Sequence, residues 1–303
     1  MSDHGAEPPR ILVAGATGDL GGRIARALRA RGAAVVAPIR RGTEAGRVLA
    51  LRHQGIEPLA LDLDDEAAMT GACEGAACIV SALNGLEHTI IGTQSVLLRA
   101  AVAAGVPRFI PSDFSLDFTR TTPGGNRNLD LRRAFHGLLD AAPIRATSIL
   151  NGGFADMLAG EMPLILPRLG RVLYWNSPDQ KLDFTAKDDV AAFTAEAALD
   201  DGTPRILRIA GSEASARDLA RIATEVHGRA FTPTGLGGTR TLSAMIRAAR
   251  ILAPGKGQVF PPWQGLQYLR DMFSGQGKLT PLDNDRYPRL TWTTLREVLE
   301  GGR

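Results

Sequence analysis

The stretch "ILVAGATGDLGGRIARALRARG", residues 11–32, decides the fold. An apolar run leads directly into a glycine-rich loop and then into a helical pattern that ends at Gly32. Gly15, Gly18 and Gly21 have the spacing G-x-x-G-x-x-G. Glycines at such a turn permit tight bending, close approach of a pyrophosphate and close packing of helix on strand.

This loop predicts a dinucleotide site, because the start of the following helix offers free N–H groups and a partial positive charge to phosphates. The alternative is a strand-to-helix turn that is merely tight. The residues expected to contact the nucleotide are Gly15, Thr17, Gly18, Asp19, Leu20 and Gly21.

Arginines follow the second apolar run, "AVVAPIR", where an acidic residue would bind the ribose hydroxyls of NAD. Arg40 and Arg41 stand there instead. A guanidinium suits a 2′-phosphate, so these residues favour NADPH over NADH. The alternative is a pair of solvated arginines on a loop.

Short apolar runs alternate with helical patterns through the first half of the chain, which predicts a parallel sheet covered on both faces. Right-handed crossovers then give an α/β fold with a doubly wound parallel Rossmann sheet. The predicted strands are residues 10–16, 34–40, 57–63, 77–83, 108–112 and 145–151, and the predicted helices are near 44–54, 65–72, 88–104 and 126–141.

The second half is less regular and predicts a smaller, discontinuous C-terminal α/β substrate lobe. Strands are expected in "RVLYWNS", "KLDFT" and "RILRIAG", helices at 214–228, 240–253 and 262–274, and Gly/Pro-rich breaks at 233–238 and 254–262. We therefore expect an NADP-binding domain over 1–155, with returning segments near 182–211, and a substrate lobe made of 156–181 and 212–303.

Composition restricts the class of function. The net charge is +3 with scattered arginines, so we expect no nucleic-acid partner. Cys73 and Cys78 lack the spacing of a redox pair or zinc site, and we expect no metal. The polar start, "MSDHGAEPPR", is no signal peptide, and no apolar run reaches membrane-spanning length. We expect a cytoplasmic monomer or homodimer.

Ligands of an open α/β sheet lie beyond the carboxyl ends of its strands. Ser81, Leu83 and Asn84 end the fourth predicted strand and should border the cofactor. Ser112, Asp113 and Phe114 end the fifth and are candidates for contacting a substrate, although Asp113 is more readily explained as bracing the next loop.

The glycine loop, Arg40 and "RFIPSDFSLD" together resemble the NmrA-like and isoflavone-reductase-like atypical short-chain dehydrogenases. The segment from Thr147 to Phe154 and "FTAKDDVAAFTAEAAL" resemble two further patterns of that family. The resemblance weakens after about residue 212. It implies NADPH bound to a Rossmann domain and an aromatic substrate under a smaller lobe, with Asn151, Gly152 and Phe154 beside the nicotinamide.

The expected acid is missing. Classical short-chain dehydrogenases use Tyr-x-x-x-Lys, but the residues four beyond the three tyrosines are Pro178, Met272 and Thr291. The resemblance implies a single Lys on the helix before the sixth strand. Two alignments place that Lys at Ala134 or at Asp130, and the first lysine of the chain is Lys181.

His136 is the candidate replacement, because an imidazole exchanges protons near neutral pH. On a helix whose apolar face is expected to be Leu131, Ala134, Phe135, Leu138 and Ala142, His136 shares another side with Arg132 and Asp140. That side is either a solvated polar face or the place of a proton donor.

Four aromatic residues, Phe260, Trp263, Tyr268 and Phe273, lie between Gly- and Pro-rich breaks. They could form a wall that stacks on a planar substrate, with Trp263 as the main candidate. The alternatives are the lobe's own core or a dimer contact.

Two functions fit these residues. The first is an NADPH-dependent reductase of a small aromatic or conjugated substrate, such as a quinone, an enone or a benzylic carbon, with His136 or water as the proton source. The second is a non-catalytic NADP(H) redox sensor that binds a partner protein.

Overall fold

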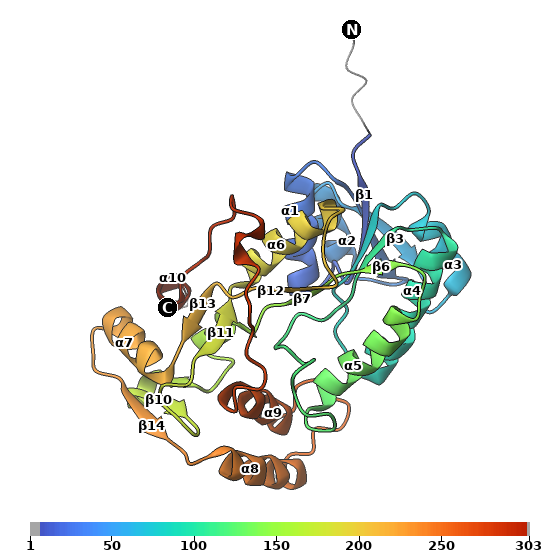
Figure 1. Cartoon of the computed structure of the whole chain (residues 1–303). Helices are drawn as coiled ribbons and strands as arrows, with labels where there is room; N and C mark the ends of the chain where they lie inside the picture. Colours follow the sequence, from blue (N-terminus) through green and yellow to red (C-terminus); the bar gives the residue numbers. More distant parts are fainter. Residues whose placement is uncertain (1–6, 302–303) are drawn as a thin grey trace. The chain divides into compact units, whose positions relative to one another are not determined.

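The computed structural model describes residues 7–301 (Figure 1). The first six residues, with which the predicted 1–155 domain and the polar N-terminal segment begin, lie outside the described part, as do residues 302–303. The chain divides into two compact units. The sheet unit consists of Met1–Ser112, Ala134–Ser148 and Ala191–Ile206, and the second unit consists of Asp113–Arg133, Ile149–Val190 and Leu207–Arg303.

The sheet unit contains a six-stranded parallel sheet in the order β3-β2-β1-β4-β5-β6. The direction of winding reverses between β1 and β4, which confirms the predicted doubly wound Rossmann topology. The strands are β1 Arg10–Ala14, β2 Ala34–Arg40, β3 Glu57–Leu61, β4 Cys78–Ser81, β5 Arg108–Ile110 and β6 Arg145–Ala146.

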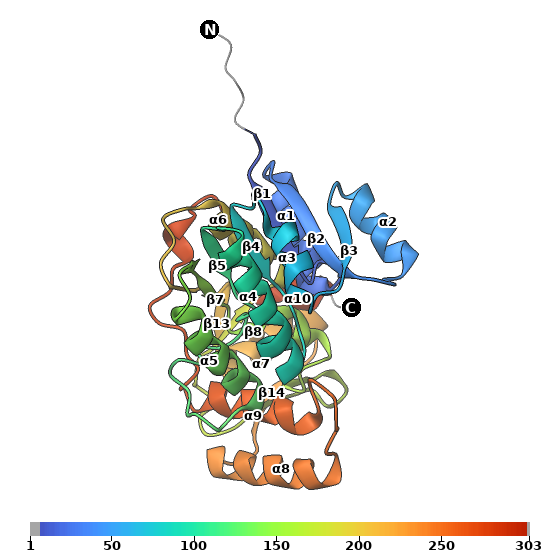
Figure 2. The same ribbon diagram turned by 90° about the vertical axis from the view of Figure 1, so that its right-hand side faces the viewer.

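The helices of this half lie close to their predicted ranges. They are α1 Asp19–Ala30, α2 Ala45–His53, α3 Glu66–Cys73, α4 Gln94–Ala103, α5 Arg127–Asp140 and α6 Lys187–Leu199. The predicted helix 88–104 begins as a π-helical segment, His88–Thr93. There the buried Gln94 side chain donates to the carbonyl of Ile90 and accepts from the Ser112 N–H. In Figure 2, α2 lies beside the outer strand β3.

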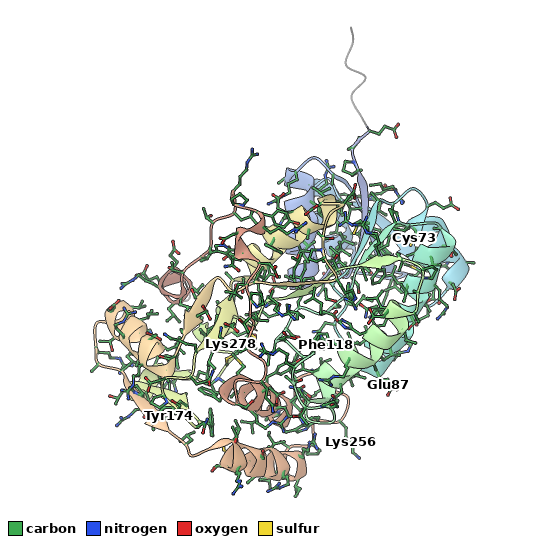
Figure 3. All side chains as sticks on the ribbon, viewed as in Figure 1. Cys73, Glu87, Phe118, Tyr174, Lys256 and Lys278 are labelled. Atoms are coloured by element: carbon green, nitrogen blue, oxygen red, sulfur yellow. The ribbon has the colours of Figure 1, made fainter. Side chains whose placement is uncertain are left out.

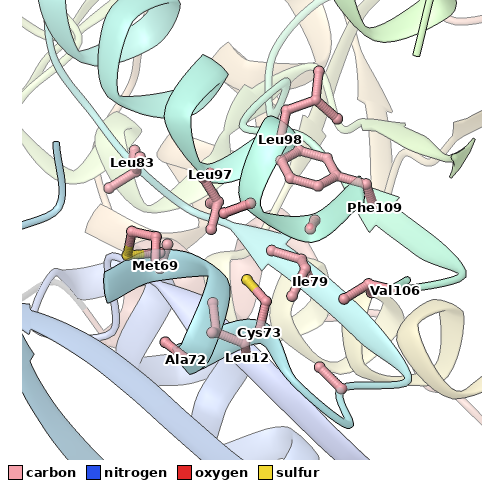
Figure 4. Packing of buried hydrophobic residues seen from close by; sticks show 14 of the residues in the cluster. Leu12, Met69, Ala72, Cys73, Ile79, Leu83, Leu97, Leu98, Val106 and Phe109 are labelled. Atoms are coloured by element: carbon pink, nitrogen blue, oxygen red, sulfur yellow. The ribbon is translucent and has the colours of Figure 1, made fainter. Parts of the chain in front are cut away.

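The core of the sheet unit lies under α3 and α4 (Figure 4). Leu12, Ile79 and Phe109 point into this core and are fully buried. Along each strand they alternate with residues that point to the opposite face of the sheet. Cys73 and Cys78 are free, buried thiols. Burial raises the pKa of Cys73 to about 11 and that of Cys78 to about 12, so neither thiol is a thiolate at neutral pH.

Helix α5 buries a different face from the one predicted. Phe135 is buried as expected, but Ala134 is exposed and Leu138 is 47% exposed. The buried side is instead Leu129, Arg132, Phe135 and Leu139. Phe135 and Leu139 enter the core of the sheet unit, and this fixes the rotation of the helix about its axis. The same rotation buries Arg132, one turn before Phe135.

The predicted strand 145–151 divides at Thr147. The Thr147 N–H still donates to Phe109, but its hydroxyl bonds Thr203 and the Pro204 carbonyl. Beyond it, β7 Ser148–Leu150 leaves the six-stranded sheet and pairs with β12 Ile206–Arg208.

The second unit contains two three-stranded sheets, β14-β10-β9 and β13-β11-β8. Their strands are β8 Gly153–Phe154, β9 Ile165–Leu166, β10 Arg171–Tyr174, β11 Leu182–Thr185, β13 Ser212–Ala214 and β14 Thr232–Gly235. The helices of this unit are α7 Ala216–His227, α8 Thr239–Leu252, α9 Pro262–Phe273 and α10 Leu295–Gly301. None of the helices in the described part of the chain is long and apolar enough to cross a membrane.

The predicted break at 233–238 was wrong in its first residues, because β14 forms there. Its partner β10 holds it in parallel register, with Val172 opposite Pro233. Strand β14 forms because it pairs with β10, which is distant in the sequence. No local pattern reveals such a partner.

Candidate cofactor and substrate site

The glycine loop leaves no room for side chains at two positions. Gly15 has a φ of +92°, and a Cβ there would lie 2.6 Å from the Ala82 carbonyl oxygen. A Cβ at Gly21 would lie 2.2 Å from the Gly15 carbonyl oxygen. Strand β4 and the start of α1 therefore both pack against the backbone of the loop, as the predicted roles of these glycines require.

The N-terminus of α1 is open to an anion. Gly18 is its N-cap in extended conformation, with no capping side chain, and the Gly18 N–H donates to Gly15 at 2.9 Å. The first amides of a helix have no acceptor within the helix, and its dipole favours negative charge there. Asp19 would oppose a phosphate, but Arg23 binds its carboxylate at 2.7 Å. Thr17 and Leu20 are half-buried beside these amides.

Arg40 and Arg41 are exposed at the end of β2. The turn that presents them is closed by Thr43, whose hydroxyl donates to the Arg40 carbonyl at 2.7 Å. Among residues 7–301, neither guanidinium forms an ion pair. Two uncompensated cations at this strand end fit the phosphate expected there.

The end of β4 contains one orphaned polar atom. Ser81 is fully buried, and within the described residues its hydroxyl has no hydrogen-bond partner. Asn84 is exposed, and the Leu83 carbonyl accepts from the Ser112 hydroxyl at 2.6 Å. The predicted substrate residue Ser112 therefore braces the β4 and β5 ends against each other.

In the second unit, the Asn151–Gly152 turn meets the segment after β5. The N–H groups of Asn151 and Gly152 both donate to the Ser115 carbonyl, at 2.9 and 3.1 Å. Gly152 has a φ of +69°, and a Cβ there would lie 2.4 Å from the Asp183 carbonyl oxygen. Two sequence-predicted segments are thus brought together, and Phe154 follows them half-buried.

Asn151 also has an orphaned acceptor. Asn151 is fully buried, and its side-chain Oδ1 has no hydrogen-bond partner in the described part of the chain. An unsatisfied buried carbonyl is costly unless a ligand or water supplies a donor. The carboxamide of a nicotinamide carries such a donor. Asp113 and Phe114 are almost fully buried in the same unit.

Two lysines of the second unit are held in ion pairs. Lys278, labelled in Figure 3, binds both Asp183 and Glu213. Its hydrogen bonds to these carboxylates outweigh burial and raise the pKa of the Lys278 ammonium. Lys181 binds Asp218 at 2.5 Å. The Lys278 ammonium is therefore not poised to give up a proton near neutral pH.

His136 lies in a hydrogen-bonded group of the sheet unit. Its Nε2 is 3.0 Å from the Ser148 hydroxyl, which accepts from Arg205 at 2.7 Å. Arg205 also binds Asp140 at 2.8 Å. Of the predicted polar side of α5, Asp140 is exposed and Arg132 is buried, so this side is not one solvated face. The role of His136 in proton transfer stays a prediction.

Trp263 is largely buried, at 8% exposure, within the second unit. Its indole N–H donates to the Pro254 carbonyl at 3.0 Å. Arg127 and Arg250 each lie over its ring, 4.7 Å from the centroid. These contacts favour the alternative of a core residue of the lobe, and its contact with substrate stays a prediction.

Sequence reasoning missed the burial of Arg132. It placed this residue on a polar side of α5, whereas the helix buries it. The burial of Arg132 follows from the entry of Phe135 into the core of the sheet unit, which the spacing of α5 alone does not reveal.

Known proteins resemble this chain in sequence and in fold. Residues 7–246 match the model of the NmrA-like family. The chain is 31% identical to pinoresinol reductase 1 of Arabidopsis thaliana over 212 residues, which are 65% of this chain and 67% of that protein. It is 30% identical to the isoflavone reductase homolog IRL of Zea mays over 213 residues, 64% and 66% of the two chains.

Solved structures share the fold over nearly the whole chain. That of AtPrR2 with NADP+ and (+)pinoresinol has a TM-score of 0.84 at 24% identity, covering 98% of this chain and 100% of its own. That of leucoanthocyanidin reductase with NADPH from Vitis vinifera has a TM-score of 0.82 at 22% identity, covering 97% and 99%.

Proposed function

The chain belongs to the NmrA-like family, and on this basis we propose that it is an NADPH-dependent reductase of a small aromatic or conjugated substrate. The substrate class is a quinone, an enone or a benzylic carbon. The observation that carries the proposal is the glycine loop, in which Gly15 and Gly21 pack without room for a Cβ beside an uncapped helix N-terminus. The names of the reductase relatives support an aromatic substrate.

Each part of the cofactor has residues that would hold it. The first amides of α1 would bind the pyrophosphate. Arg40 and Arg41 would bind the 2′-phosphate, and Asn151 Oδ1 would accept from the nicotinamide carboxamide. When bound, NADPH supplies a hydride from C4 of the nicotinamide, and the protein contributes position and control of charge.

The proton has to come from a different group than in better-known relatives of this fold. The sequence has no Tyr-x-x-x-Lys, and Ala134 or Asp130 occupies the position that corresponds to the family Lys. We propose that this chain is an atypical short-chain reductase that has neither the Tyr-x-x-x-Lys pair nor the family Lys. Its substrate then takes the proton from another side chain or from water.

The protein is proposed to act in the cytoplasm, as a monomer or homodimer. The support for this compartment is the pair of free, buried thiols, since disulfides are rare where glutathione keeps thiols reduced.

The experiment is a substrate panel. Oxidation of NADPH is followed with quinones, enones and benzylic ethers, and products are identified by mass spectrometry. The proposal expects stoichiometric loss of NADPH and a product two hydrogens heavier for at least one class. Tight NADPH binding without turnover on the whole panel would contradict it.

That contradicting outcome would favour the second candidate, a non-catalytic NADP(H) redox sensor. The absence of the family Lys from the aligned positions speaks for it. A sensor would bind NADP+ and NADPH with different affinities and change its association state, which calorimetry and light scattering measure.

A further inference from the structure

Helix α8 ends in the two most exposed large apolar side chains of residues 7–301. Ile251 is 80% exposed and Leu252 is 83% exposed. Phe260, in the loop that leads from α8 to α9, is 57% exposed. Single apolar residues are ordinary on a protein surface, but a cluster of them marks a surface that contacts something apolar.

The chain folds back after α8 and brings these three side chains to one place. The Trp263 indole N–H donates to the Pro254 carbonyl at 3.0 Å. A Cβ at Gly255 would lie 2.5 Å from the Pro261 Cβ. The residues that follow Leu252 therefore lie against the residues that follow Phe260. The resulting cluster, the apolar tip, consists of Ile251, Leu252 and Phe260.

Hydrogen bonds hold the loop that carries this tip. Arg127 donates to the Val259 carbonyl at 2.6 Å, and the Asn128 side chain donates to the same carbonyl at 3.1 Å. The Gln258 N–H donates to the Gly255 carbonyl at 3.0 Å. A loop that is already ordered loses little conformational entropy when it binds a partner.

The outward face of α8 is basic. Arg240, Arg247 and Ile251 follow one another at intervals of seven and four residues, so they share one face of the helix. All three are exposed, whereas Leu242 and Ile246 on the opposite side are buried against the protein. Neither Arg240 nor Arg247 forms an ion pair within the described residues. In Figures 1 and 2, α8 lies beside α9, its main neighbour.

Acidic residues are missing from a long segment around this face. Residues 226–270 contain six of the 35 basic residues of the chain and none of its 32 acidic ones. The segment therefore has a charge of +6, and the rest of the chain has a net charge of −3. The arginines of the protein are scattered, but its acids are not, and the resulting excess of positive charge lies on α8 and its flanks.

We propose that α8 and the apolar tip dock the protein reversibly on an anionic lipid surface. The basic residues of α8 meet the headgroups, and the apolar tip enters the boundary between headgroups and acyl chains. This inference does not depend on the proposed function. A second copy of the chain fits the surface less well, because a two-fold contact would place the cationic face against itself.

The test is sedimentation with vesicles of phosphatidylcholine alone and of phosphatidylcholine with an equal part of phosphatidylglycerol. The protein should bind only the anionic vesicles, and less as NaCl is raised, since salt screens the attraction. Ile251→Ser with Leu252→Ser should weaken binding about tenfold or more. Arg240→Gln with Arg247→Gln should weaken it about 25-fold, which is about fivefold for each charge removed.

Helix α2 of the sheet unit supplies the matched controls. Leu49 is 52% exposed there, and Arg47 and Arg52 are exposed on the same helix. Leu49→Ser removes an exposed apolar side chain, and Arg47→Gln with Arg52→Gln removes two charges, as the α8 variants do. Both should bind anionic vesicles as the wild type does. Calorimetry with NADPH should give the wild-type affinity for all variants, which shows that they are folded.

A fluorescent variant tests whether the tip enters the lipid. In Phe260→Trp, the emission of the new indole should shift to shorter wavelength when anionic vesicles are added, because the ring leaves water. The proposal would be overturned by a wild type that does not bind, by an equal loss in the α2 charge variant, or by an unshifted emission. A dimer in light scattering that Ile251→Ser with Leu252→Ser dissociates would assign the surface to a second copy instead.

Discussion

Replacing Gly21 by alanine tests the packing of the nucleotide loop. The added Cβ would lie 2.2 Å from the Gly15 carbonyl oxygen and 3.1 Å from the Ala16 nitrogen. Both are backbone atoms, so no side chain can rotate away, and either α1 or the loop must shift. Forced overpacking of this kind costs about 1–3 kcal/mol.

Helix propensity acts in the opposite direction, because alanine is favoured over glycine within a helix by about 1 kcal/mol. Gly71 in α3 supplies the matched control, since a Cβ there meets no atom within 4 Å. Gly71→Ala should therefore raise the free energy of unfolding by about 0.5–1 kcal/mol. Gly21→Ala should lower it by up to about 2 kcal/mol, which is the overpacking cost of about 1–3 kcal/mol less the propensity gain of about 1 kcal/mol.

Urea unfolding measures both free energies, and calorimetry with NADPH measures the consequence for binding. A shift of the loop withdraws amides from the pyrophosphate, so Gly21→Ala should weaken NADPH binding about tenfold or more, which corresponds to about 1.4 kcal/mol. Gly71→Ala should bind as the wild type does. If Gly21→Ala were as stable as Gly71→Ala and bound NADPH normally, the reasoning about this loop would be refuted.

Three further predictions follow from other parts of the chain. Arg40→Gln with Arg41→Gln should weaken NADPH binding about 10- to 100-fold and leave NADH binding nearly unchanged, as measured by calorimetry, whereas Arg47→Gln on α2 should change neither. Asp218 has a pKa well below its usual range because Lys181 and Ser215 hydrogen-bond its carboxylate. The stability that this carboxylate gives the folded protein is therefore present above pH 4 and is lost as pH falls through the native pKa. Asp218→Asn should lower the free energy of urea unfolding by about 1 kcal/mol at pH 7, and an equal loss at pH 2 would contradict this cause. Cys73 and Cys78 should resist a thiol reagent at pH 8 in the native protein and react at once in urea, because burial raises both pKa values to about 11 and 12; rapid labelling of the folded protein would show that the core is open.

Local patterns were sufficient where a short segment determines its own structure. The glycine spacing and the alternation of apolar runs predicted β1, α1 and the doubly wound sheet. These elements are predictable because the hydrophobic pattern of each segment shows which of its residues are buried. Strand β14 and the division at Thr147 were not predictable in this way. Both depend on partners far along the chain, β10 in one case and Thr203 and Pro204 in the other.

The same limit explains what was missed at the candidate site. The rotation of α5 follows from the entry of Phe135 and Leu139 into the core, and the pattern of the helix alone favoured a face containing Leu138. Because the predicted face was wrong, Arg132 was interpreted as polar surface, whereas the helix buries it. The placement of Asn151 and Gly152 beside the nicotinamide came from the family resemblance, and it stays a prediction.

Direct transfer of hydrogen from the cofactor to a substrate is the central claim. NADPH carrying deuterium at C4, prepared separately in each of its two stereochemical forms, is incubated with the substrate that the panel identifies. Mass spectrometry of the product should show deuterium from one form and none from the other. A product without deuterium from either form, or NADPH that stays bound and unconsumed, would contradict the account.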